Sequence, residues 1–121
     1  MKKTILFLSL LLLSPLSYAE EPIDSYATKL SEQDHQNSEG KKLTAVGDIL
    51  RQDRANYHKY AVRDAEDQAD TVFTEAKNRE RIPAMLKKGK TDKVTQNSIL
   101  NGTPVVFVLI YKNHIDIVTH E

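Results

Sequence analysis

The sequence contains no cysteine, and this absence excludes several classes of protein at once. The chain cannot form a disulfide, bind a metal through thiolates or act as a thiol oxidoreductase. It also cannot carry the lipid of a bacterial lipoprotein, because that lipid is attached to a cysteine at the cleavage site. The domain must therefore fold by burying apolar side chains, without covalent cross-links.

A net charge is lacking too, because 17 basic side chains balance 17 acidic ones. Dedicated nucleic-acid-binding domains usually carry a basic excess, so we expect no nucleic-acid partner. A length of 121 residues suffices for one domain with one modest hydrophobic core.

Catalytic and metal-binding motifs are missing as well. No serine lies in a G-x-S-x-G elbow, and no two of the four histidines have the spacing that would place them on one helical face as metal ligands. We therefore predict no catalytic residue, no metal site and no cofactor, and we favour a non-enzymatic protein.

The N-terminus has the pattern of a secretory signal peptide. Two lysines follow Met1, an apolar run covers residues 5–13, and the small-residue tripeptide 17–19 follows Pro15. The apolar run is shorter than the roughly 20 residues that a spanning helix needs. We predict cleavage near Ala19, a mature protein without a membrane span, and a periplasmic or secreted location in a bacterium.

Cleavage would leave a mature chain of 102 residues, in which we distinguish two regions. Residues 20–40 are mostly polar and are predicted to form a flexible N-terminal segment. A single α+β domain is predicted over residues 41–121.

Two helical patterns open this domain. Apolar residues recur at spacings of three, four and seven positions from Leu43 to Tyr60, which predicts an amphipathic helix over about residues 41–61. Gly47 lies within this pattern and weakens the helix there. A second apolar stripe, at residues 69–76, predicts another helix that begins near Ala65.

The rest of the chain predicts short helices followed by a hairpin. A short helix restarts at Pro83, or a longer one is kinked there, and Thr91 or Asp92 caps a last helix. A β-branched and aromatic run, residues 105–111, and the alternating run 115–119 predict two paired strands.

The first of these strands is apolar on both faces, so we expect both faces to be covered. A third strand from residues 23–30 and a second copy of the chain are the two alternatives for the missing cover, since a lone hairpin is marginal in water. The predicted fold is therefore a small single α+β domain, with two to four helices followed by a C-terminal β-hairpin.

The densest polar segment runs from Arg51 to Asp70 and supplies the candidate binding residues. They are Arg51, Arg54, Tyr57, His58, Arg63 and Asp64. We favour an interaction protein of the inhibitor, immunity or adaptor type, in which this segment or the hairpin edge binds a protein partner. The alternative is a small-ligand or metal-binding protein, or a minor hydrolase, with a polar pocket around Arg54 and His58. A homodimer sealed through the hairpins is a further alternative.

Overall fold

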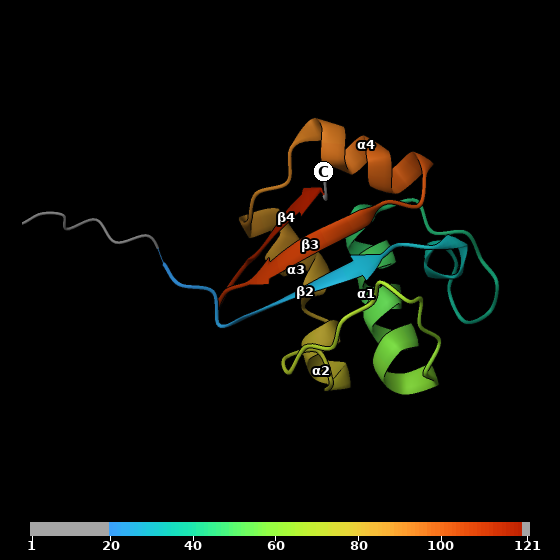
Figure 1. The fold of residues 1–121 in the computed structure, drawn as a ribbon, viewed down its shortest axis with the longest axis horizontal. Helices are drawn as coiled ribbons and strands as arrows, with labels where there is room; N and C mark the ends of the chain where they lie inside the picture. Colours follow the sequence, from blue (N-terminus) through green and yellow to red (C-terminus); the bar gives the residue numbers. More distant parts are fainter. Residues whose placement is uncertain (1–19, 120–121) are drawn as a thin grey trace, which may run out of the picture.

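A three-stranded antiparallel sheet in the order β2-β3-β4 organises the fold, and the helices α1 and α3 lie behind it in the view of Figure 1. The computed structural model describes residues 20–119. The elements in chain order are β2 (Asp24–Lys29), the 3-10 helix η1 (Glu32–His35), α1 (Val46–Ala55), the π-helix η2 (Asn56–Tyr60), α2 (Ala76–Arg79), α3 (Ile82–Lys88), α4 (Lys93–Asn101), β3 (Val105–Ile110) and β4 (Ile115–Thr119). The described residues thus confirm a small α+β domain with four α-helices and a C-terminal hairpin, β3–β4.

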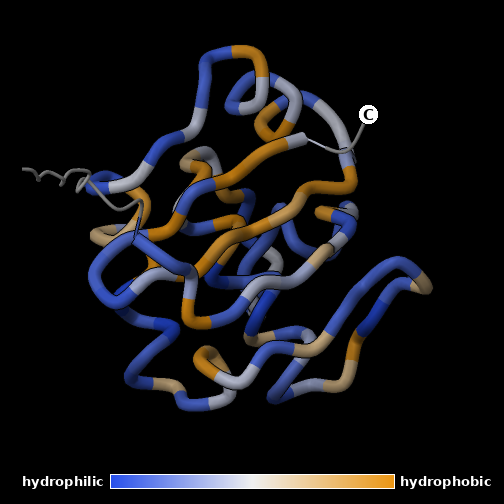
Figure 2. Tube along the Cα trace, turned by 60° about the vertical axis from the view of Figure 1, so that its left-hand side comes forward, coloured by the Kyte–Doolittle hydropathy of each residue, from blue (hydrophilic) through white to orange (hydrophobic). Residues whose placement is uncertain are grey.

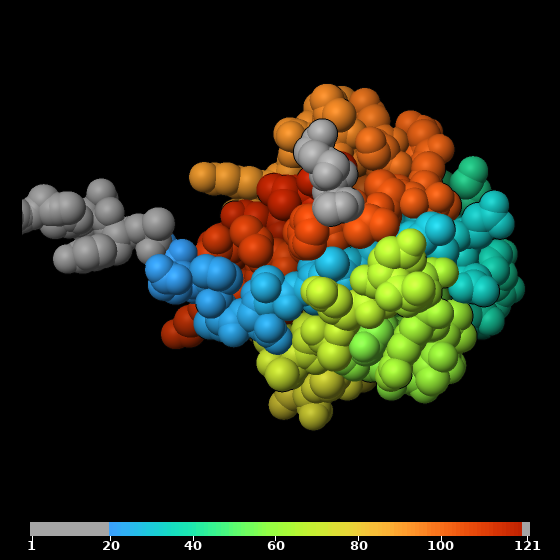
Figure 3. Space-filling model, viewed as in Figure 1, coloured from blue at the N-terminus to red at the C-terminus, as the bar shows by residue number. Residues whose placement is uncertain are grey.

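Alternation along the strands gives the sheet one buried face. Tyr26, Val108 and Ile117 lie opposite one another in register, and all three side chains are buried. The hydropathy colours of Figure 2 show hydrophobic residues along the strands in the middle of the molecule. The opposite face, which Figure 3 shows, presents Phe107 and Val118 outward.

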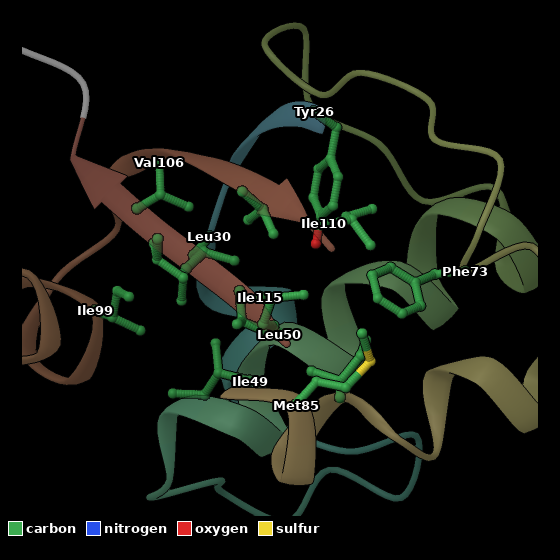
Figure 4. Close-up of a cluster of buried hydrophobic side chains, with 13 residues drawn as sticks. Tyr26, Leu30, Ile49, Leu50, Phe73, Met85, Ile99, Val106, Ile110 and Ile115 are labelled. Atoms are coloured by element: carbon green, nitrogen blue, oxygen red, sulfur yellow. The ribbon is translucent and has the colours of Figure 1, made fainter. Parts of the chain in front are cut away.

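The buried sheet face packs on the helices to form one core, drawn in Figure 4. Ile49 and Leu50 of α1, Met85 of α3 and Ile99 of α4 meet the strand side chains there. Gly47 allows the close approach of α1 and α3, because a Cβ at this position would lie 2.9 Å from the Cα of Pro83. Glycine at this position therefore weakens the helix but permits its packing on α3.

The third strand predicted as one alternative is present as β2, which pairs with β3 along its whole length. Residues 24–35 consequently belong to the folded domain, and the prediction of a flexible segment over residues 20–40 is wrong for them. Tyr26 and Leu30 are both fully buried. The strand β2 was not predicted with certainty because most of its residues are polar and few of its side chains point into the core.

Two predicted helices differ from the observed ones. The helix expected over residues 41–61 is shorter, since α1 ends at Ala55 and continues as the π-helix η2. The helix expected from Ala65 is wrong: residues 61–75 form a loop without helix, and helical structure begins again only at α2. Asp70 explains this difference, because its Oδ2 accepts the backbone N–H groups of Val72 and Phe73 and so competes with a helical ladder.

The predicted starts of the last two helices are confirmed. Asp92 caps α4 by accepting the backbone N–H of Thr95 at 2.7 Å, and Pro83 lies in the first turn of α3. The predicted signal peptide, residues 1–19, lies outside the described residues. Within residues 20–119, no helix is both long enough and apolar enough to cross a membrane.

Candidate functional site

The candidate site is centred on Arg54, which the C-terminal turn of α1 directs into the protein. Its side chain is 0 % exposed. Its Nε donates to Asp53 Oδ2 at 2.9 Å, and its Nη1 donates to Asp70 Oδ1 at 2.9 Å and to the carbonyl oxygen of Gln68 at 2.9 Å. A buried guanidinium is thus held by two carboxylates and one carbonyl, which compensates for the loss of its hydration.

Two tyrosine rings complete the surroundings of this cation. The guanidinium carbon of Arg54 lies 3.9 Å from the ring centroid of Tyr26 and 4.7 Å from that of Tyr57. Burial raises the pKa of Tyr26, and its hydroxyl is buried without a hydrogen-bond partner among the described residues. Burial by itself would lower the pKa of Arg54, but Tyr26 and Asp53 raise it, so the guanidinium is charged.

The hydroxyl of Thr28 connects the sheet to this cluster. Thr28 Oγ1 lies 2.7 Å from Asp53 Oδ1 and 3.0 Å from Asp67 Oδ1, and Arg54 Nη2 donates to it at 3.3 Å. The backbone N–H of Lys29 donates to the same oxygen of Asp67 at 2.9 Å. Thr28 therefore joins β2, α1 and the loop of residues 61–75 at one point.

Burial raises the pKa of two carboxyl groups in the cluster. The pKa of Asp53 is raised to about 8 by burial, against the opposing effect of Arg54. Burial also raises the pKa of Asp34 in η1, although the side chain of Asn56 donates to its Oδ1 at 2.9 Å. The charge of Asp34 also raises the pKa of Asp53, and that of Asp67 raises the pKa of Asp34, so the cluster favours retention of a proton.

His58 lies at the edge of the cluster. Its Nε2 is 2.7 Å from Asp70 Oδ1, the oxygen that also accepts from Arg54. Its ring meets the ring of Tyr57 edge-on, with centroids 5.0 Å apart. The pair of His58 and Asp70 therefore continues the buried network toward the surface.

The structure brings four of the six sequence-predicted residues together: Arg54, Tyr57, His58 and Arg63. The guanidinium carbon of Arg63 lies 4.1 Å from the Tyr57 centroid, and its Nε donates to the Tyr57 carbonyl oxygen at 3.0 Å. Tyr57 is thus contacted by two guanidinium groups, one buried and one exposed.

The other two predicted residues, Arg51 and Asp64, lie apart from this group. Arg51 is part-exposed, pairs with Asp48 at 3.4 Å and lines a cavity of about 210 Å³ with Lys59 and Arg79. Asp64 donates its backbone N–H to Asp67 Oδ2 at 2.7 Å and lines a different cavity, of about 370 Å³.

Sequence reasoning missed several members of the cluster, both outside and inside the Arg51–Asp70 segment. Tyr26, Thr28 and Asp34 lie outside it, and the three aspartates that lie inside it were not among the candidates: Asp53, Asp67 and Asp70. The alternation of Tyr26, Thr28 and Leu30 was the available signal, because a period of two places these residues on one face of a strand. Tyr26 and Leu30 are also four residues apart, which is helical spacing, so these two residues by themselves do not reveal the alternation of a strand.

Above the cluster, the chain makes an unusual turn, which we call the presenting turn (residues 59–63). The π-helix η2 ends at Tyr60, and the next residue, Ala61, has a left-handed φ of 57°, the only positive φ of a non-glycine residue in residues 20–119. Tyr60 and Val62 flank it and are 44 % and 38 % exposed. Both line a groove of about 560 Å³, whose other walls are largely amide and hydroxyl side chains: Gln33, Gln36, Asn37, Ser38, Gln52 and Asn56.

Among the described residues, no group of three or more histidine, aspartate or glutamate side chains is arranged to hold a metal ion. Comparison of the chain with protein-family models, with curated proteins and with solved structures finds no match. The functional argument therefore depends on the geometry of the site itself.

Proposed function

We propose that this protein is a non-enzymatic, exported interaction protein of the inhibitor, immunity or adaptor type, and that it binds a partner protein through the presenting turn. The observation that carries the proposal is the strained backbone at Ala61, which holds Tyr60 and Val62 in solvent beside the amide-lined groove. Export is part of the proposal and is supported by the pattern of residues 1–19.

Backbone strain at an exposed turn favours a binding role. A left-handed conformation is unfavourable for alanine, and such conformations persist only where the surrounding structure enforces them. Here the backbone N–H of Val62 donates to the carbonyl oxygen of Asn56 at 2.8 Å, and Arg63 is stacked on Tyr57. The turn is therefore preorganised, which reduces the entropic cost of binding.

The side chains of the turn are of the kinds that dominate protein interfaces. Tyrosine and arginine are enriched among the residues that carry binding energy. Hydrogen bonds with Ser38 and Lys59 lower the pKa of Tyr60. The turn carries two cations, Lys59 and Arg63, and so we propose a partner that inserts an apolar side chain flanked by carboxylates.

The buried cluster also favours an interaction protein over a ligand-binding protein, because Arg54 is not accessible from solvent. A polar pocket around Arg54 and His58 would need the guanidinium to be accessible to a ligand, whereas all of its hydrogen-bond donors with assigned partners point to internal acceptors. The alternative of a small-ligand protein or hydrolase at this place is therefore less favoured. The cluster serves to position the turn above it.

Native mass spectrometry of the protein purified gently from the host periplasm tests the proposal. We expect a complex with one protein of defined mass, which is lost in Tyr60→Ser and Val62→Ser and retained in Val94→Ser. Val94 is a matched control because it is 73 % exposed on α4, away from the turn. Equal loss in all three variants would contradict a binding role for the turn. A bound small molecule sensitive to His58→Ala would support the alternative pocket, and a doubled mass would support the homodimer.

A further inference from the structure

The hydroxyl of Thr28 lies between two carboxylates, and this arrangement requires an additional proton. Thr28 Oγ1 is within hydrogen-bond distance of Asp53 Oδ1 and of Asp67 Oδ1, at 2.7 and 3.0 Å. A hydroxyl carries a single hydrogen, so it can donate to only one of these oxygens. The other oxygen must donate to the hydroxyl, and only a protonated carboxyl group can do so.

The contacts of the two carboxyl groups show which one carries the proton. Both oxygens of Asp67 accept backbone N–H groups, Oδ1 from Lys29 at 2.9 Å and Oδ2 from Asp64 at 2.7 Å. Asp53 Oδ2 accepts from Arg54 Nε, whereas Thr28 is the one assigned partner of Asp53 Oδ1 among the described residues. The proton therefore belongs on Asp53 Oδ1, while Thr28 donates to Asp67.

We propose that a single proton on Asp53 Oδ1, donated to Thr28, fastens the loop of residues 61–70 to β2, and that loss of this proton in alkaline solution releases the loop. Ionised Asp53 would leave two anionic oxygens in contact with one hydroxyl, which has one hydrogen to give. Their repulsion acts on Asp67, because Asp53 is fixed on α1 and Asp67 belongs to the loop.

The loop is suited to such release because polar contacts hold it. No side chain of residues 61–69 is buried. The loop covers the free edge of β2, where Gln68 donates its N–H to the Ala27 carbonyl oxygen and its Oε1 accepts the Ala27 N–H, at 2.8 and 2.9 Å. Figure 3 shows this segment, in yellow-green, beside β2, in blue.

The charged and titratable groups around Asp53 come from every polar element packed on it. They are Arg54 on α1 itself, Tyr26 on β2, Asp34 on η1, His58 on η2, and Asp67 and Asp70 in the loop. The helices α3 and α4 present Ile82, Met85 and Ile99 to the core, and Arg79 of α2 donates to the carbonyl oxygens of Phe73 and Thr74. Arg54 is the one fixed cation of this set, and it is shared with Asp70. The pKa of Asp53, raised to about 8 by burial, agrees with a proton retained at neutral pH.

Two matched asparagine variants test the proposal by urea unfolding. In Asp53→Asn the new N–H can donate to Thr28 while the amide oxygen accepts from Arg54, and no proton has to be kept at pH 7, so the unfolding constant at pH 7 should fall. In Asp67→Asn one oxygen that accepts a backbone N–H is lost, and the unfolding constant should rise by about tenfold or more. Equal losses in the two variants would overturn the assignment of the proton.

The pH dependence supplies a second readout. Between the ordinary carboxyl pKa of 3.8 and about 8, the folded protein holds a proton that the unfolded chain has lost. Stability from this group is therefore present at low pH and is lost as the pH rises, so the unfolding constant should rise by up to about tenfold per pH unit relative to Asp53→Asn. A ratio that does not change between about pH 5 and about pH 8 would overturn the proposal.

Amide hydrogen exchange in the unmodified protein separates loop release from global unfolding and does not depend on the variants. The protection factor of the Lys29 amide, which is bonded to Asp67, should fall above about pH 8. The Leu30 amide, which donates to the Pro104 carbonyl oxygen at 2.9 Å, is the internal control and should remain protected. A Lys29 protection factor that follows that of Leu30 through this range would contradict release of the loop.

Discussion

Replacement of Arg54 by methionine would remove the cation at the centre of the buried cluster and retain much of its volume. Asp53 and Asp70 would each lose a charge-assisted hydrogen bond of 2.9 Å, and the Gln68 carbonyl oxygen would lose its donor. Removal of one partner from a buried ion pair typically costs about 3–5 kcal/mol, because the other charge stays buried without compensation. A domain of this size is stable by about 5–15 kcal/mol, so the variant should fold with a large part of its stability lost.

Urea unfolding followed by circular dichroism at pH 7 measures this loss, with Arg54→Lys as the matched control. Lysine keeps the charge, but a single ammonium group cannot reach the several acceptors that the planar guanidinium serves, so the control should show a smaller loss. In Arg54→Met, Asp53 loses the cation that lowers its pKa, so its pKa should rise above about 8 and the loss should grow as the pH rises through this value.

A loss below about 1 kcal/mol at an unchanged denaturant slope would refute this reasoning. Such a result would mean that the buried carboxyl groups do not need the cation for stability. Arg54 would then be a residue held for a ligand, and the alternative function would regain its support.

Three further predictions concern the rest of the fold. Gly89→Ala should destabilise the protein by more than about 2 kcal/mol, because the added Cβ would overlap the backbone carbonyl of Ile115; thermal unfolding measures it. Thr28→Val keeps the shape of the side chain but removes the hydroxyl between two carboxyl groups, and it should cost about 1–3 kcal/mol in the same assay. Asp92→Ala should lower the unfolding midpoint by less than Gly89→Ala does. Because the cap to Thr95 lowers the pKa of Asp92, the loss of stability in Asp92→Ala relative to the unmodified protein should disappear as the pH falls below the ordinary carboxyl range.

The hairpin and the last two helices could be predicted because their signals are local. An uninterrupted apolar run, mostly β-branched, forms β3 between Val105 and Ile110, and the side chain of Asp92 caps α4 by a bond to a residue three positions away. Pro83 likewise determines the start of α3 through its own backbone. Interactions of this range are encoded in a few consecutive residues.

The loop of residues 61–75 could not be predicted in the same way, because its conformation depends on partners distant in sequence. Its stripe of Ala69, Val72 and Phe73 has helical spacing, but of these three only Phe73 is buried in the core. Gln68 bonds to β2 across 41 residues, and Asp70 bonds to Arg54 across 16. Tertiary hydrogen bonds overrode the helical pattern, and the same bonds assemble the candidate site.

The cluster also explains how a chain without cysteine fixes a long loop. The segment 61–69 has no buried side chain, so the hydrophobic effect supplies little to hold it, and a disulfide is not available. Arg54 instead bonds to Gln68 and Asp70 of the loop at once, and it does so from a helix that is anchored in the core by Ile49 and Leu50. Because these anchors belong to the core and the bonds to the loop, weakening of the bonds should open the loop before the sheet. The presenting turn begins this loop, so the stability of the buried cluster sets how firmly the turn is held for a partner.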